Sequence, residues 1–97
     1  MGTADSIDDA ARRWLEQARY DLETARAMLE AHRYVYVLFC CQQAVEKTLK
    51  GRIAQNTGKL PPRSHNLPAL ADAASVGLDE PRRDFLRELS AYYVQSR

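Results

Sequence analysis

Four basic residues in the middle of the sequence are the first candidates for a chemical role. They are Lys47, Lys50, Arg63 and His65, and residues 42–65 contain five lysines and arginines but only one acid. A local excess of positive charge attracts phosphate groups and acidic protein surfaces. The loop with Arg63 and His65 leads into a predicted helix, whose first N–H groups can also bind an anion. We therefore predict nucleotide or RNA binding here. The simpler alternative is a solvated helix end, with His65 hydrogen-bonded to a neighbouring backbone group.

Asp21 is a carboxylate on the apolar side of the first predicted helix. At about 100° per residue it falls in the same arc as Trp14 and Leu22. An unpaired buried charge costs several kcal/mol, so this side chain needs a partner, such as Lys47, Lys50 or a tyrosine hydroxyl. We interpret Asp21 as a structural contact between helices; a catalytic role is the alternative.

Gln43 and Glu46 belong to a polar strip on the second predicted helix. Glu46 precedes Lys50 by four residues, the favourable orientation for a helical ion pair. Such a pair stabilises a helix by only about 0.2–0.5 kcal/mol. Helix stability alone therefore does not explain the polar strip. Its side chains are also suited to line a groove or a dimer interface.

The sequence predicts no metal site, no cofactor site and no assignable catalytic residue. The two cysteines, Cys40 and Cys41, are adjacent, which disfavours a disulfide between them. No further cysteine is present to build a disulfide framework or a zinc site. We expect both thiols to be reduced and packed in the interior.

The elements that must position these residues are helices. The apolar pattern predicts an all-α fold, an antiparallel up-and-down bundle of four or five helices that forms one domain over residues 1–97. The first helix has Asp5 or Ser6 as its N-cap and continues without Pro or Gly to about residue 32. Its apolar residues follow the spacing of a buried stripe: Ala11, Trp14, Ala18, Leu22, Ala25 and Leu29.

Three further helices are predicted, at about residues 34–56, 66–75 and from 79 onward. Gly58 suits the left-handed position after a helix, and Gly77 is expected to break the third helix. Asn66 or Ser64, and then Asp79, are the expected N-caps. The last helix should bury Phe85, Leu86, Leu89, Tyr92 and Tyr93.

The second helix is predicted to be apolar on two sides. One side contains Val35, Leu38, Val45, Leu49 and Ile53, and the other contains the small residues Cys40, Cys41, Ala44, Thr48 and Gly51. Such a helix lies either in the centre of a bundle or between two subunits. The second alternative predicts a homodimer that buries side chains between Val35 and Leu49.

Composition excludes several classes of protein. The chain has 97 residues, too few for two hydrophobic cores, and its net charge of +1 implies no particular partner. The longest apolar stretch, Val35–Cys41, has seven residues, far fewer than the roughly 18 that cross a bilayer. The first nine residues are polar and acidic, unlike a secretory signal. We therefore expect a cytoplasmic protein.

These segments also resemble a known family, the minimal prokaryotic HEPN domain, over essentially the whole chain. The most specific part of the resemblance is the block from Gln42 to Lys47, Gln-Gln-Ala-Val-Glu-Lys. We call Gln42–Lys50 the polar block. The other matching residues are Tyr20-Asp21-Leu22, Ala25, Tyr34, Cys41, Gly58, Pro61, Ser64-His65-Asn66-Leu67, Leu70, and the segment from Tyr93 to Arg97, which matches the start of a terminal Tyr…Arg-Tyr-Pro signature.

The resemblance implies a helical bundle that dimerises. It further implies a role as the binding or regulatory partner of a minimal nucleotidyltransferase, in a toxin–antitoxin-like pair. Two alternatives are a metal-independent endoribonuclease toxin and a structural interaction module without a ligand.

Many HEPN relatives are ribonucleases with an Arg-x(4–6)-His motif on a late helix of each subunit. In this sequence Arg26 and His32 have that spacing, but they lie at the end of the first predicted helix. No such motif occurs in the last helix. The resemblance therefore favours a binding role over an enzymatic one.

Overall fold

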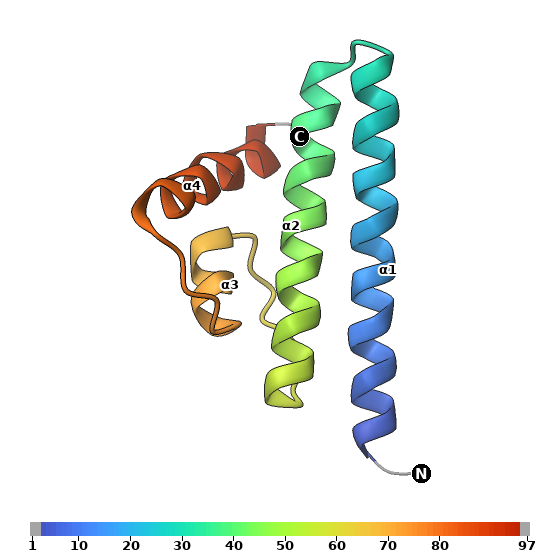
Figure 1. The fold of residues 1–97 in the computed structure, drawn as a ribbon, viewed down its shortest axis with the longest axis vertical. Coiled ribbons are helices and arrows are strands. Elements are labelled where there is room, and N and C mark those ends of the chain that lie inside the picture. Colours follow the sequence, from blue (N-terminus) through green and yellow to red (C-terminus); the bar gives the residue numbers. More distant parts are fainter. Residues whose placement is uncertain (1–2, 96–97) are drawn as a thin grey trace.

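The computed structural model describes the backbone of residues 3–95 and the side chains of residues 9–92. The helices in this range are α1 (Thr3–Glu30), α2 (Tyr34–Thr57), α3 (Leu67–Ala73) and α4 (Glu80–Gln95), and no strand is present between residues 3 and 95. The predicted all-α fold of four helices is confirmed. α1 and α2 form a long antiparallel hairpin, and the shorter α3 and α4 lie on the far side of α2 from α1 (Figure 1).

The hairpin is held together by small residues. Ala11, Ala18 and Ala25 are buried on α1 at intervals of seven residues, and α2 is the one helix against which α1 packs in the described part of the chain. On α2, Gly51 lies where an added Cβ would be 3.1 Å from Trp14 Cβ and 3.3 Å from the Ala11 carbonyl oxygen. The absence of a side chain at Gly51 therefore lets the two backbones approach closely.

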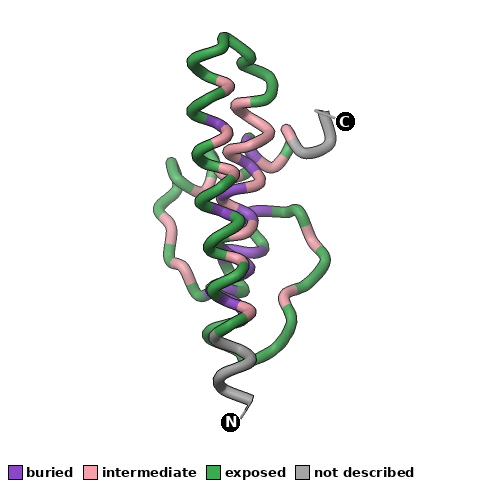
Figure 2. The backbone as a smooth tube through the Cα atoms, turned by 90° about the vertical axis from the view of Figure 1, so that its right-hand side faces the viewer, coloured by how far each residue is buried: buried purple, intermediate pink, exposed green. Residues whose placement is uncertain are grey.

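The main core lies on the other side of α2, among α2, α3 and α4. It consists of Leu49, Ile53, Leu67, Leu70, Ala71, Ala74 and Leu89. α2 is thus central in the fold, the first of the two alternatives for a helix with two apolar faces. Figure 2 shows the buried residues gathered along the middle of the molecule, whereas the tip of the hairpin is exposed.

Local signals fix most helix ends. Gly58 has φ 69° and donates its N–H to Ala54 after α2, and the Asn66 side chain accepts from Ala69 N–H at 3.0 Å at the start of α3. Asp79 Oδ1 accepts from Arg82 N–H at 3.0 Å at the start of α4. These three predicted caps are confirmed. Gly77 was expected to break the third helix, but α3 already ends at Ala73, and Ser75 is left-handed with φ 59°.

Three other predictions about the helices are wrong. α1 begins at Thr3, so the backbone positions of Asp5 and Ser6 lie inside it and not at its N-cap. Leu22 and Leu29 are about half exposed, although they were expected in the core. The reason is that α1 contacts α2 through its alanines, and the leucines lie about 50° further round the helix.

Phe85 was also expected in the core, and it is 60% exposed. α4 presents Leu86, Leu89 and Tyr92 to the core. At about 100° per residue Phe85 lies only about 40° from Leu89 and about 20° from Tyr92 around the helix, so the phase of α4 does not account for its exposure. The Tyr93 side chain lies outside the described residues.

The close approach at Gly51 generates a stability prediction. Gly51→Val should lower the free energy of unfolding by about 1–3 kcal/mol, because the added methyl groups must displace Trp14 or the α1 backbone. Gly77→Ala is the matched control, since an added Cβ there meets no atom within 4 Å. Urea unfolding of both variants measures the difference. Equal stability of the two would contradict the close packing of α1 on α2.

Candidate functional site

Glu46, a buried carboxylate on α2, has three polar side-chain partners. Oε1 accepts from Gln42 Nε2 at 2.8 Å and lies 2.9 Å from His65 Nδ1. Oε2 accepts from Lys50 Nζ at 3.0 Å. An ionised carboxylate can only accept hydrogen bonds, so Nδ1 is the protonated nitrogen of His65 in this contact. Glu46 therefore joins one face of α2 to the loop before α3.

The surrounding contacts complete this network within the polar block. Gln43 Nε2 donates to Gln42 Oε1 at 2.7 Å, and Gln42 itself is fully buried. The Lys50 ammonium lies 5.8 Å from the centre of the Trp14 ring, close enough for a cation–π contact. Only 9% of the Lys50 side chain is exposed. Its charge is thus directed at Glu46 and Trp14, inside the protein.

Burial acts to raise the pKa of the Glu46 carboxyl. Hydrogen bonds from Gln42, His65 and Lys50, together with the charge of Lys50, outweigh that effect, and the pKa is lowered. Glu46 is therefore a carboxylate at neutral pH. It is placed to stabilise neighbouring cations and not to act as a general acid.

Lys47 lies in a second ion pair, with Asp21 on α1. Nζ is 2.7 Å from Asp21 Oδ2, and only 21% and 17% of the two side chains are exposed. At this distance the two opposite charges form a close ion pair that is largely shielded from water. Of the three partners considered for Asp21, Lys47 is the one that the structure places there. The pair connects α1 to α2 on the opposite side from α3 and α4.

The two thiols are not activated nucleophiles. Burial, with the charge of Asp21 nearby, raises the pKa of Cys40, and burial raises the pKa of Cys41. Both are free and partly buried. Because the thiolate is the reactive form, these cysteines act as packing residues at neutral pH.

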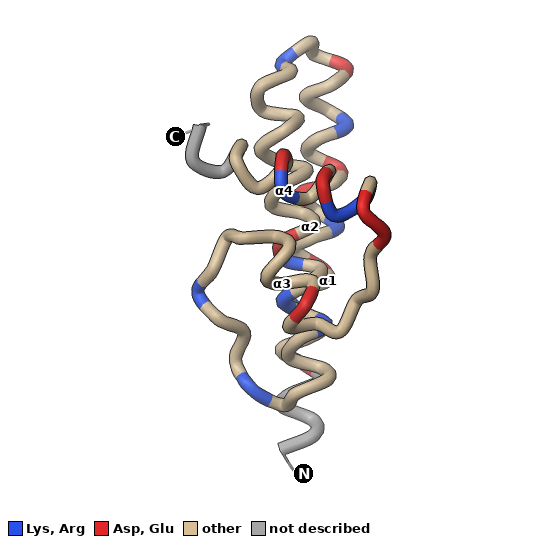
Figure 3. The backbone as a smooth tube through the Cα atoms, turned by 90° about the vertical axis from the view of Figure 1, so that its left-hand side faces the viewer, with Lys and Arg blue, Asp and Glu red and all other residues tan. Residues whose placement is uncertain are grey.

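The loop between α2 and α3 is the basic segment that remains open to solvent. In Figure 3 it contains basic residues and no acid. Arg63 is exposed, and 44% of the His65 side chain is exposed. Neither an ion pair nor a hydrogen bond joins Arg63 to Lys47, Lys50 or His65 among the described residues. The structure therefore brings together two of the four candidate residues, Lys50 and His65, around a carboxylate.

The backbone N–H groups at the start of α3 are already engaged. Leu67 N–H donates to Ser90 Oγ at 2.7 Å, Ala69 N–H to Asn66 Oδ1, and Asn66 N–H to Ser64 Oγ at 3.1 Å. Pro68 has no N–H to offer. A phosphate at this helix start would have to displace these side chains. The role of Ser90 was missed in the sequence, where its one signal was a small polar residue directly after Leu89 on the core face.

His65 and Ser90 also line a shallow hollow of about 660 Å³ between α3 and α4. Its two arginines are paired: Arg83 makes a two-pronged contact with Asp72 at 2.8 and 2.9 Å, and Arg87 contacts Asp84.

Among the described residues, no group of three metal-ligating side chains is found. No helix in this range is long and apolar enough to cross a membrane. Arg97 lies outside the described residues.

A family model described as HEPN domain matches residues 11–97 of the chain. The match includes the polar block and the loop with His65. No match was found among curated proteins or among solved structures.

The Asp21–Lys47 pair generates a second stability prediction. Asp21→Ala should lower the free energy of unfolding by about 1–3 kcal/mol, because it leaves the largely buried Lys47 ammonium without its partner. Asp21→Asn should cost less, since the amide keeps one acceptor oxygen. Gln17→Ala, at an exposed position of the same helix, is the control for helix propensity. Melting temperatures that do not separate Asp21→Ala from Gln17→Ala would contradict a structural role for this pair.

The lowered pKa of Glu46 generates a pH prediction. A carboxyl whose pKa is lower in the folded protein stabilises it above the unfolded value, about 4.3, and this contribution is lost as the pH falls through the folded value. Glu46→Gln should therefore destabilise the protein by about 1–3 kcal/mol at pH 7. It should also flatten the decline in stability below about pH 4.5. Urea unfolding from pH 3 to 7 measures this, with Glu88→Gln at an exposed position of α4 as control; a steep acid-side decline retained in Glu46→Gln would contradict the assignment.

Proposed function

The chain belongs to the HEPN domain family, and from this membership we propose that it is the binding and regulatory partner of a minimal nucleotidyltransferase. The two proteins would form a toxin–antitoxin-like pair in the cytoplasm, with this chain present as a homodimer. In this proposal the chain acts through the surfaces it presents and carries out no reaction itself.

One observation supports a binding role most directly: the charges of the polar block are neutralised inside the chain. Lys50 is paired with Glu46, and Lys47 with Asp21. An ammonium that already has a carboxylate partner gains little from a phosphate, because it would have to give up the first contact. The polar block thus supports the fold, and exposed surfaces remain for recognition.

Nucleotide or RNA binding is a secondary part of the proposal and rests on the loop between α2 and α3. There Arg63 is exposed, and part of the His65 ring reaches solvent. Two groups of this kind would give weak binding that depends on salt, because the phosphate contact releases counterions.

The competing function is metal-independent RNA cleavage. The Arg26 and His32 pair has the required sequence spacing, and both residues are exposed, Arg26 in the last turns of α1 and His32 in the turn that follows it. His32 Nδ1, however, lies 2.8 Å from the Tyr34 hydroxyl. These residues are also far along the chain from α4, the late helix in which the resemblance places the ribonuclease motif.

One experiment separates the two functions. The purified chain is mixed with a minimal nucleotidyltransferase from the same organism and, separately, with a short single-stranded RNA in EDTA. We expect a complex with the nucleotidyltransferase in sedimentation velocity at micromolar concentrations. With RNA we expect weak binding that is lost at about 0.3 M salt and reduced by Arg63→Ala.

RNA cleavage in EDTA that His32→Ala abolishes would overturn the proposal in favour of a ribonuclease. The absence of a complex with the nucleotidyltransferase at tens of micromolar would contradict the regulatory role. Tyr20→Ala, on the outer surface of α1, is the control for effects of a surface substitution.

A further inference from the structure

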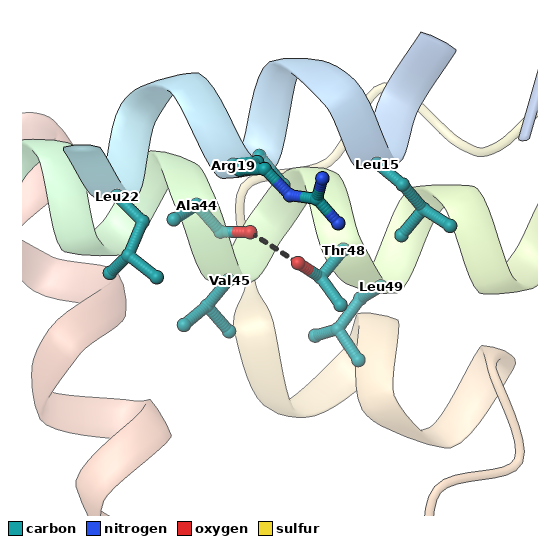
Figure 4. Close-up of a pocket in the computed structure, with 8 residues that line it drawn as sticks. Leu15, Arg19, Leu22, Ala44, Val45, Thr48 and Leu49 are labelled. Carbon is teal, nitrogen blue, oxygen red and sulfur yellow. Dashed lines mark hydrogen bonds between the residues drawn. The ribbon is translucent and has the colours of Figure 1, made fainter. Parts of the chain in front are cut away.

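Three leucines on α1 form an apolar stripe that the rest of the chain covers only in part. Leu15, Leu22 and Leu29 are 45%, 52% and 51% exposed and lie seven residues apart. Two of them line a groove of about 470 Å³ between α1 and α2, together with Ala18, Arg19, Ala44, Val45, Thr48 and Leu49. Figure 4 shows Leu15 and Leu22 of α1 on the same side of the two helices as Val45 and Leu49 of α2. A seven-residue repeat of leucine is the spacing with which one helix packs along another.

Charged residues follow the same repeat beside the stripe. Arg12, Arg19 and Arg26 form one column, and Glu16, Glu23 and Glu30 form a second. At about 100° per residue both columns lie on the side of the leucines away from the alanines that contact α2. Among the described residues, none of these side chains except Arg12 has an ion-pair partner; Arg12 contacts Asp9.

We propose that the leucine stripe and its groove bind a second copy of this chain, with the two α1 helices antiparallel and Leu22 at the two-fold axis. This assignment rests on the homodimer in the proposed function and names the surface that forms it. In this arrangement Leu15 packs near Leu29 of the partner subunit, and each α1 helix covers the groove of the other copy.

The antiparallel direction follows from the charge columns. In the antiparallel dimer the two-fold axis is perpendicular to both α1 helices. The charged columns of the two copies then lie on the same side of the interface, next to each other. With a rise of about 1.5 Å per residue, Arg19 then lies within about 3 Å, along the axis, of Glu23 of the partner subunit. The same offset holds for Arg26 with Glu16 and for Arg12 with Glu30. Parallel helices would instead place each arginine column against the alanine side of the other helix.

The balance of charge also selects the occupant. Beside the stripe lie three arginines and three glutamates, so this face has no net charge to attract nucleic acid. The arginine column and the glutamate column both repeat every seven residues. They can therefore pair with the same two columns on an antiparallel second copy. A closed two-fold dimer uses such a self-complementary face on both subunits.

The first test is the oligomeric state of the purified chain. Sedimentation equilibrium should give a dimer at micromolar concentrations, and Leu22→Glu should weaken dimerisation at least 100-fold, because it places two carboxylates at the two-fold axis. Leu22 is half exposed within one chain, so circular dichroism should show that the variant keeps its helices. Tyr20→Glu, at a position 69% exposed on the outer side of α1, should leave the dimer intact.

The second test is the register. In a Cys40→Ala/Cys41→Ala background, Leu22→Cys should cross-link to itself with a short bismaleimide. Leu15→Cys should not cross-link to itself, but should do so when mixed with Leu29→Cys. Self-cross-linking of Leu15→Cys would indicate parallel helices and overturn the register.

A monomer at about 100 µM, or a dimer unaffected by Leu22→Glu, would overturn the assignment of this surface. If the chain is a monomer that binds the nucleotidyltransferase, and Leu22→Glu abolishes that binding, the groove is the binding site for the nucleotidyltransferase and not a dimer interface. A Leu22-dependent dimer that binds no nucleotidyltransferase would support this surface while contradicting the proposed function.

Discussion

The fold depends on how one buried carboxylate, Glu46, is compensated. A charge at this depth is tolerated only where hydrogen bonds and an opposite charge replace the water it has lost. Gln42 and Lys50 supply these from α2, and His65 supplies one from the loop before α3. Because His65 is 19 residues away in sequence, this contact fixes the loop to α2. The loop in turn leads into α3, whose first N–H group is held by Ser90 of α4.

The same arrangement makes the polar block more important to stability than an ion pair on a single helix would be. An isolated Glu46–Lys50 pair would stabilise α2 by only a few tenths of a kcal/mol. In the folded chain, removal of one partner leaves a buried charge unpaired, which costs several-fold more. The polar block and the loop residue His65 therefore depend on each other in this fold, and both lie within the part of the chain that the HEPN family model matches.

The sequence predicted the helices well because their signals are local. Gly58, Asn66 and Asp79 act on residues within one turn, and the apolar repeat shows directly that α1 is helical. The sequence could not show which side of α1 meets α2, because alanine and leucine columns both fit a buried stripe. Gly51 decides this, since it lets the alanine side approach and leaves Leu22 outside. In the same way, a basic stretch could be recognised in the sequence, but the pairing of Lys50 with Glu46 and of Lys47 with Asp21 depends on tertiary contacts.

The central claim is that the cations of the polar block are engaged within the protein and are not held ready for a ligand. A double-mutant cycle between Glu46 and Lys50, with Glu46→Gln and Lys50→Met, measures this most directly. We predict that the two substitutions are coupled by about 1–3 kcal/mol in the free energy of unfolding at pH 7. A coupling energy near zero would mean that the Lys50 ammonium is solvated independently of Glu46, and it would contradict the account.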